Sequence, residues 1–139
     1  MTAPAETETD RRQRGGTALR GVFAAVAIVH AVLVFAQPIL AGMSLEGRDG
    51  ALDLHYANGM AIMTVAAVQI VAALLWWKPG GGPARAIGVS AVLLVLEVVQ
   101  FLIGSAGGFT LHLPLGIVLL LGAAAAAYLP FRQRDEIAA

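Results

Sequence analysis

The chain has 139 residues, of which 58% are hydrophobic and 13% are charged, and its nine basic side chains balance nine acidic ones. This composition is typical of a membrane protein and excludes an ordinary soluble domain, and we expect no nucleic-acid partner. The absence of cysteine excludes disulfides, thiolate metal ligands and iron–sulfur clusters. Any redox centre must therefore use His, Met or carboxylate side chains.

The first part of the chain changes from polar to apolar. Residues 1–20 have little to bury, and we expect a disordered cytoplasmic tail there. Residues 21–41 are apolar over about the 20 positions that a helix needs to cross a bilayer. A cleaved signal peptide is the alternative, but the segment is long for one and contains His30 and Gln37. We therefore predict a membrane-spanning helix, followed by an acidic, glycine-rich loop over 42–53.

Three further apolar segments follow, separated by short breaks. The break KPGGGP over 78–83 cannot continue a helix and is predicted to be a turn. Trp76 and Trp77, just before it, are typical of a membrane interface. The predicted fold class is all-α, a four-helix transmembrane bundle over 21–130. We expect its spans over 21–41, 56–77, 84–103 and 111–129, before a second cytoplasmic tail over 131–139.

Two segments of the chain share one motif. Leu54–Gly59 reads LHYANG and Leu111–Gly116 reads LHLPLG, so both contain L-H-x-x-x-G at the start of an apolar run. Each copy follows a segment in which a glutamine stands four residues before a small residue, Gln37 in the first copy and Gln100 in the second. The chain therefore reads as one helical hairpin used twice, with the extra length of the first copy in its loop.

The distribution of basic residues predicts the orientation. Eight of the nine Lys and Arg residues lie in the two tails and around the turn between the second and third spans. Because basic residues collect on the cytoplasmic side, we expect both termini inside, in the cytoplasmic membrane of a bacterium. Hairpins of equal orientation are parallel repeats, which place the second and fourth spans across the bundle from each other. His55 and His112 should then point at one another near the extracytoplasmic side.

Small residues lie on the same helix face as each of these histidines. They stand four and eleven positions on, as Gly59 and Ala66 in one span and Gly116 and Ala123 in the other. They either leave a slot for a flat molecule or let the helices pack closely, as small residues do in membranes. Two facing neutral imidazoles supply the two axial bonds of a haem iron. We therefore predict one haem b, with the two histidines as iron ligands and the glycines, alanines and glutamines of both copies around it.

The run from Val99 to Leu121, VQFLIGSAGGFTLHLPLGIVLLL, resembles one half of haem A synthase. In that family a helix ending in Gln and small residues is followed by a short turn and a helix that opens with a haem-ligating His. Each four-helix half of such an enzyme holds a haem between histidines of its second and fourth helices, and His55 and His112 occupy the matching places. Tyr56 follows the first His where the family usually has Arg, so the resemblance implies haem binding more strongly than haem A synthesis. The chain is also similar to small four-helix actinobacterial membrane proteins of uncharacterised function.

Three polar residues, His30, Gln69 and Glu97, are expected near the midplane, roughly 12 to 18 Å from the cytoplasmic edge at about 1.5 Å per residue. An ionisable group at this depth should face the bundle interior and find a partner, and His30 is the ionisable candidate for Glu97. The sequence leaves three interpretations open. The trio is a polar plug that fixes helix register, a proton or quinone site coupled to the haem, or a second metal site.

Arg48 is the one basic residue expected outside, and it either pairs with haem propionates or lies solvated in its loop. Two functions remain open for the chain as a whole. One is a haem b protein for electron transfer or haem handling, with a quinone or a protein as its redox partner. The other is a haemless accessory subunit of a larger membrane complex. An enzyme is less expected, because one four-helix unit offers one haem place; a homodimer would provide two.

Overall fold

The chain is helical in the computed structural model, which describes residues 7–138. Most of these residues belong to four helices, and no strand occurs among them. The predicted all-α class is thereby confirmed. The helices are α1 (Glu8–Leu45), α2 (Ala51–Trp77), α3 (Arg85–Ser105) and α4 (Phe109–Ala138).

Each of the four helices is long and apolar enough to cross a membrane. Their outward faces carry large apolar side chains, and Val32, Leu102 and Leu121 are each more than 60% exposed. Such a surface is costly in water but suits lipid, and the helical hydrogen bonds satisfy the backbone within the bilayer. The chain is thus a multi-pass membrane protein, as the composition predicts.

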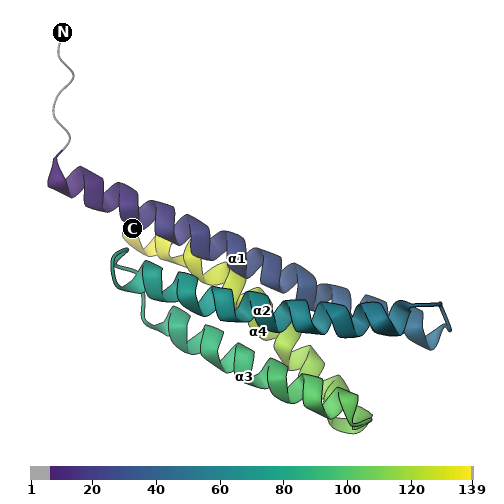
Figure 1. Cartoon of the computed structure of the whole chain (residues 1–139). Helices are drawn as coiled ribbons and strands as arrows, with labels where there is room; N and C mark the ends of the chain where they lie inside the picture. The colour runs from purple at the N-terminus through teal and green to yellow at the C-terminus, as the bar shows by residue number, and fades with distance from the viewer. Residues whose placement is uncertain (1–6, 139) are drawn as a thin grey trace.

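The helix backbones form a ring in which each helix packs along two others. α1 packs on α2 and α4, and α3 packs on the same two helices. Among the described residues the backbones of α2 and α4 do not approach each other closely, so these two helices stand diagonally across the bundle. Figure 1 shows the α1–α2 and α3–α4 loops at one end and the α2–α3 turn at the other, beside the start of α1 and the end of α4. The two hairpins are therefore parallel repeats, as predicted.

Two apolar clusters fill the bundle. Near the α2–α3 turn, Phe23 of α1 packs on Trp76 of α2 with ring centroids 5.1 Å apart. The second cluster joins all four helices and contains Val34, Ile62, Leu93, Leu119, Ala123 and Ala126. Three of its members, one each from α1, α2 and α4, also form the floor of a pocket that faces the two hairpin loops.

Both ends of the chain differ from the expectation. Residues 8–20, expected to be disordered, continue α1, and α4 runs through 131–138; residues 1–6 lie outside the described part. A capping box begins α1, because Thr7 Oγ1 accepts the Asp10 backbone N–H while the Asp10 carboxylate accepts the Thr7 N–H. Hydropathy does not indicate a helix in this polar stretch. The T-x-x-D pattern at its start, Thr7 to Asp10, does indicate one.

The loop between α1 and α2 is shorter than expected. α1 continues to Leu45 and α2 begins at Ala51, so both copies of the L-H-x-x-x-G motif lie within helices. Gly47 and Gly50 make this tight connection with φ of 74° and 72°, a left-handed conformation that other residues rarely adopt. As a result His55 lies in the second turn of α2 and His112 in the first turn of α4, at the same end of the bundle.

Candidate functional site

A pocket of about 240 Å³ lies inside the bundle at the end that carries the hairpin loops. Every helix contributes to its wall, and both copies of the sequence motif open onto it. Most of its lining is apolar, and several lining residues come in pairs of one residue type from equivalent places in the two hairpins. The pairs are Gln37 and Gln100, His55 and His112, and Gly59 and Gly116. This is the place predicted for the cofactor.

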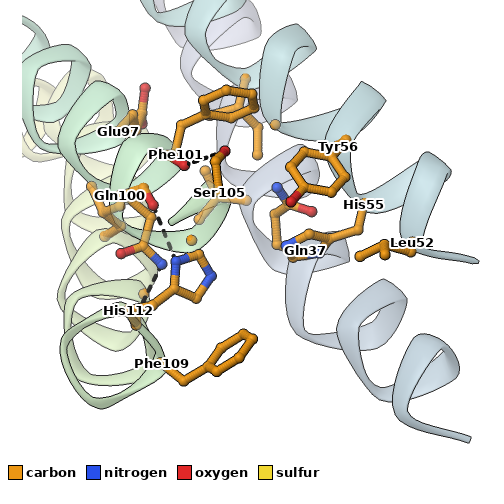
Figure 2. A pocket seen from close by; sticks show the side chains of 16 residues that line it. Gln37, Leu52, His55, Tyr56, Glu97, Gln100, Phe101, Ser105, Phe109 and His112 are labelled. Carbon is orange, nitrogen blue, oxygen red and sulfur yellow. Dashed lines mark hydrogen bonds between the residues drawn. The ribbon is translucent and has the colours of Figure 1, made fainter. Parts of the chain in front are cut away.

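His55 and His112 face each other across this pocket. Their ring centroids are 6.2 Å apart and their planes are inclined by 55°. Figure 2 shows the two rings on opposite sides of the pocket, each turned toward the space between them. Two imidazoles that bind one metal from opposite sides place their ring centres roughly 6 Å apart, since each metal–nitrogen bond is about 2 Å and a ring nitrogen lies about 1.1 Å from the ring centre. The separation therefore fits a single metal centre between them.

The backbone of α3 holds the His112 ring. Its Nδ1 lies 3.1 Å from the carbonyl oxygen of Gln100, and the Gln100 side-chain amide donates to the His112 carbonyl at 2.8 Å. A carbonyl can only accept, so Nδ1 carries the proton of the neutral ring and Nε2 keeps a free lone pair. Metal-binding histidines are commonly oriented in this way, with the second nitrogen bonded to a carbonyl. His112 is thus prepared as a ligand through Nε2.

Gln37 contacts the His55 ring in the opposite sense, with its side-chain amide. The hydrogen-bond network places the Gln37 amide nitrogen 3.0 Å from His55 Nδ1 and 3.2 Å from the His55 carbonyl, and the amide oxygen 3.3 Å from the Gly59 nitrogen. The amide N–H donates to Nδ1, so in this arrangement the proton of the neutral His55 ring lies on Nε2. Turning the amide would present its oxygen to Nδ1 and free Nε2. Gln37 therefore controls which nitrogen of His55 is free.

The motif glycines make room for these glutamines. A Cβ at Gly59 would lie 3.2 Å from the end of the Gln37 side-chain amide, and a Cβ at Gly116 would lie 3.2 Å from that of Gln100. The equal distances show that the two hairpins build the same local arrangement. Larger residues at either place would push the amide away from its histidine or fill the pocket.

Gly104 supports the second histidine only. A Cβ there would lie 2.5 Å from His112 Cε1 and 2.7 Å from Nδ1, so the imidazole rests directly on the α3 backbone. The equivalent position in the first hairpin is Ala41, which has a side chain. This contact is one place where the two repeats differ.

Aromatic residues of the pocket wall were missed by the sequence analysis. Tyr56 packs edge-on against Phe101 with centroids 6.0 Å apart, and its ring also lies 6.4 Å from that of His55. Phe109 stands beside His112 at the loop end of the pocket. Their sequence positions could have indicated that they lie beside the site, because Tyr56 directly follows His55 and Phe101 directly follows Gln100. Together these rings give the site an apolar wall.

The predicted midplane trio comes together at the floor of the site. His30 Nε2 lies 2.6 Å from Glu97 Oε1, and His30 Nδ1 lies 2.8 Å from Gln69 Oε1. All three side chains are buried. Ser90, which the sequence analysis missed, extends the network by accepting from Gln69 Nε2 at 3.0 Å. The sequence position of Ser90 could have indicated this role, because it lies two helical turns before Glu97 on the same face of α3.

Three predicted site residues lie away from the pocket. Ala66 and Ala123 are buried in the packed core and do not line it, so the small-residue slot extends only as far as the two motif glycines. Arg48 is exposed and pairs with Glu46 at 3.0 Å in the α1–α2 loop. The two alanines therefore let the helices pack closely, and the arginine lies solvated in its loop.

Comparisons of the chain with protein-family models, with curated proteins and with solved structures return no match. Among the side chains of residues 7–132, no three from His, Cys, Asp or Glu converge as ligands for a metal ion. The function is therefore inferred from the pocket and its paired histidines.

Proposed function

We propose that the protein binds one haem b between His55 and His112 and serves in electron transfer or haem handling. The observation that carries this proposal is the 6.2 Å separation of the two imidazole centroids across the bundle. The arrangement around Nδ1 of His112 supports it, because this ring can offer Nε2 to iron, and His55 can do the same when the Gln37 amide presents its oxygen to Nδ1. The largely apolar wall and the aromatic side chains beside the rings suit a porphyrin.

The site also leaves two polar atoms unsatisfied. Gln100 Oε1 and Glu97 Oε2 are buried and have no hydrogen-bond partner among the described residues, although both residues line the pocket. Buried polar atoms are rarely left in this condition. An amide oxygen can only accept, so a water held beside the haem, rather than the porphyrin itself, would satisfy Gln100 Oε1.

A haem with two imidazole ligands supplies a one-electron redox centre whose axial positions are both filled. The protein's part is to hold the rings at a fixed separation, to set their free nitrogens through Gln37 and Gln100, and to keep water away.

The visible spectrum of the purified protein tests this proposal. Reduced wild-type protein, expressed with ample haem, should show the sharp split bands of a six-coordinate low-spin haem. His55→Ala and His112→Ala should each abolish or broaden the bands, because one axial ligand is lost. His30→Ala is the matched control, a buried histidine outside the pocket lining, and should leave the bands unchanged.

A colourless wild-type protein, or unchanged bands in the His55→Ala, His112→Ala double variant, would contradict the haem assignment. The haemless accessory subunit would then be the better description. It would have to explain the paired histidines as packing groups, and the double variant should then fail to assemble with its complex.

We further propose that the pocket lies toward the extracytoplasmic side and that both termini are cytoplasmic, in a bacterial inner membrane. The support is the charge distribution, because the basic residues gather at the end of the bundle opposite the pocket. Since the chain has no cysteine, single cysteines can be introduced as labels. Gly50→Cys and Gly108→Cys should react in intact cells, and Gly81→Cys only after permeabilisation. The reverse pattern would place the pocket on the cytoplasmic side.

A further inference from the structure

A directed series of hydrogen bonds runs through the bundle to the floor of the pocket. Ser90 Oγ donates to the Ala86 carbonyl at 2.8 Å, so this hydroxyl must accept from Gln69 Nε2 at 3.0 Å. The Gln69 oxygen then faces His30 Nδ1 at 2.8 Å and can only accept. Each step determines the next, and the last one puts a proton on His30 Nδ1.

The proton on Nδ1 determines what the other side of the ring can do. His30 Nε2 lies 2.6 Å from Glu97 Oε1, and no second ionisable side chain among the described residues contacts either group. An uncharged pair in this place holds one proton between Nε2 and Oε1, either as imidazole with carboxylic acid or as imidazolium with carboxylate. Both groups are almost fully buried.

The other carboxyl oxygen of Glu97 is free. Glu97 Oε2 is buried and has no hydrogen-bond partner among the described residues, although the side chain is only 3% exposed. Glu97 lines the pocket, whose other titratable side chains are His55, Tyr56 and His112 (Figure 2). The pair thus has one oxygen committed to His30 and one without a partner.

We propose that Glu97, supported by His30, is a proton-binding site that is coupled to the charge in the pocket. This inference rests on the proposed haem. When one electron enters the pocket from a one-electron donor, Glu97 takes up one proton from water, and when the electron leaves, Glu97 releases it. Charge is balanced in both directions, and the exchange passes through Oε2.

The strength of the coupling depends on how far Glu97 lies from the His112 ring along α3. Glu97 and Gly104 are seven residues apart on this helix, a rise of roughly 10 Å, and Gly104 touches the His112 ring. A negative charge added to the pocket near Gly104 raises the proton affinity of the Glu97 carboxylate. At this distance, with an effective dielectric constant of about 20, the added charge changes the proton-binding constant of Glu97 on the order of tenfold.

A redox titration of the haem-loaded full-length protein at several pH values tests the coupling. At a fixed applied potential, the ratio of reduced to oxidised protein should be on the order of tenfold larger at the acid limit than at the alkaline limit. Glu97→Gln keeps the shape of the side chain and should abolish this difference. Glu46→Gln, the same change at an exposed carboxylate, should retain it. A pH-independent ratio in the wild type, or an unchanged dependence in Glu97→Gln, would overturn the inference while leaving the haem in place.

Infrared spectroscopy gives a readout that does not need haem. A protonated carboxyl band of the haem-free protein should appear and disappear with pH, vanish in Glu97→Gln and persist in Glu46→Gln. If Glu97→Gln fails to fold, Glu97→Asp serves instead and should shift the band, because the shorter acid sits differently against His30. A protein that binds no haem but shows this band would refute the proposed function alone, whereas the absence of any titrating band would refute the proton site.

Discussion

The two hairpins build the same site with different degrees of constraint. In each, a glutamine on the first helix reaches a histidine on the second, and a glycine one turn further on leaves space for the amide. In the second hairpin the ring lies on the bare backbone at Gly104 and its Nδ1 bonds to a carbonyl. In the first, a movable side-chain amide lies against Nδ1.

This difference separates two roles within one repeated motif. His112 is fixed by backbone atoms, whose hydrogen-bonding character cannot change. His55 is adjusted by the Gln37 amide, which can present either a donor or an acceptor. We therefore expect His112 to define the position of a bound metal and His55 to complete its coordination.

The largest effect is expected where the second hairpin is most constrained. Gly104→Ala would place a methyl group 2.5 Å from His112 Cε1, so either the ring or α3 must move. Haem affinity, measured by titrating the haem-free protein, should fall on the order of 100-fold, at the upper end of what displaced metal-ligand support costs. Ala41→Gly, the equivalent position in the first hairpin, is the matched control and should change affinity little. Equal effects of both changes would mean that the hairpins do not differ here.

An intermediate effect is expected at the two glutamines. Gln37→Leu removes a group that contacts the imidazole itself, whereas Gln100→Leu removes one that contacts only the His112 backbone and leaves the carbonyl bond to Nδ1 intact. Haem affinity should fall about tenfold for Gln37→Leu and less for Gln100→Leu. The opposite order in the same titration would show that the side-chain amide does not adjust His55.

The smallest effect is expected at the motif glycines. A methyl group at Gly59 would meet both the Gln37 amide at 3.2 Å and the Phe101 ring at 3.3 Å, whereas one at Gly116 would meet only the flexible Gln100 amide. Gly59→Ala should weaken haem binding roughly threefold, and Gly116→Ala should be close to neutral, because overpacking costs least where a neighbour can move. Should Gly116→Ala prove the more harmful, the glycine contacts would have to be reassigned.

Much of this arrangement was predictable because membrane helices follow simple rules. Apolar length gave the four helices, and the repeated motif gave the facing histidines. Depth along the helices gave the contact of His30 with Glu97. The slot expected at Ala66 and Ala123 was not found, because periodicity places residues on a face but does not show where helices converge. The distinct support of His55 and His112 was also hidden, since it depends on atoms rather than on residue spacing.

The network of His30 and Glu97 also breaks the symmetry of the repeat. The offset that relates Gln37 to Gln100 relates His30 to Leu93 and Val34 to Glu97. The polar pair therefore has an apolar counterpart, because Leu93 and Val34 lie buried in one cluster. The contact between His30 of α1 and Glu97 of α3 is ionisable, whereas the positions that the repeat relates to it hold the apolar residues Val34 and Leu93.

Because the two hairpins are alike, two first hairpins or two second hairpins from different molecules could in principle pair with each other, and the contact of His30 with Glu97 disfavours such like-with-like pairing. Two first hairpins would set His30 against Val34, and two second hairpins would set Glu97 against Leu93. Either mismatch leaves a polar group without a partner in an apolar core, at a cost of about 3–5 kcal/mol for a broken buried pair. Replacing both partners, His30→Leu with Glu97→Leu, should keep the bundle folded but remove this discrimination, so that oligomers in which like hairpins pair appear on size-exclusion chromatography.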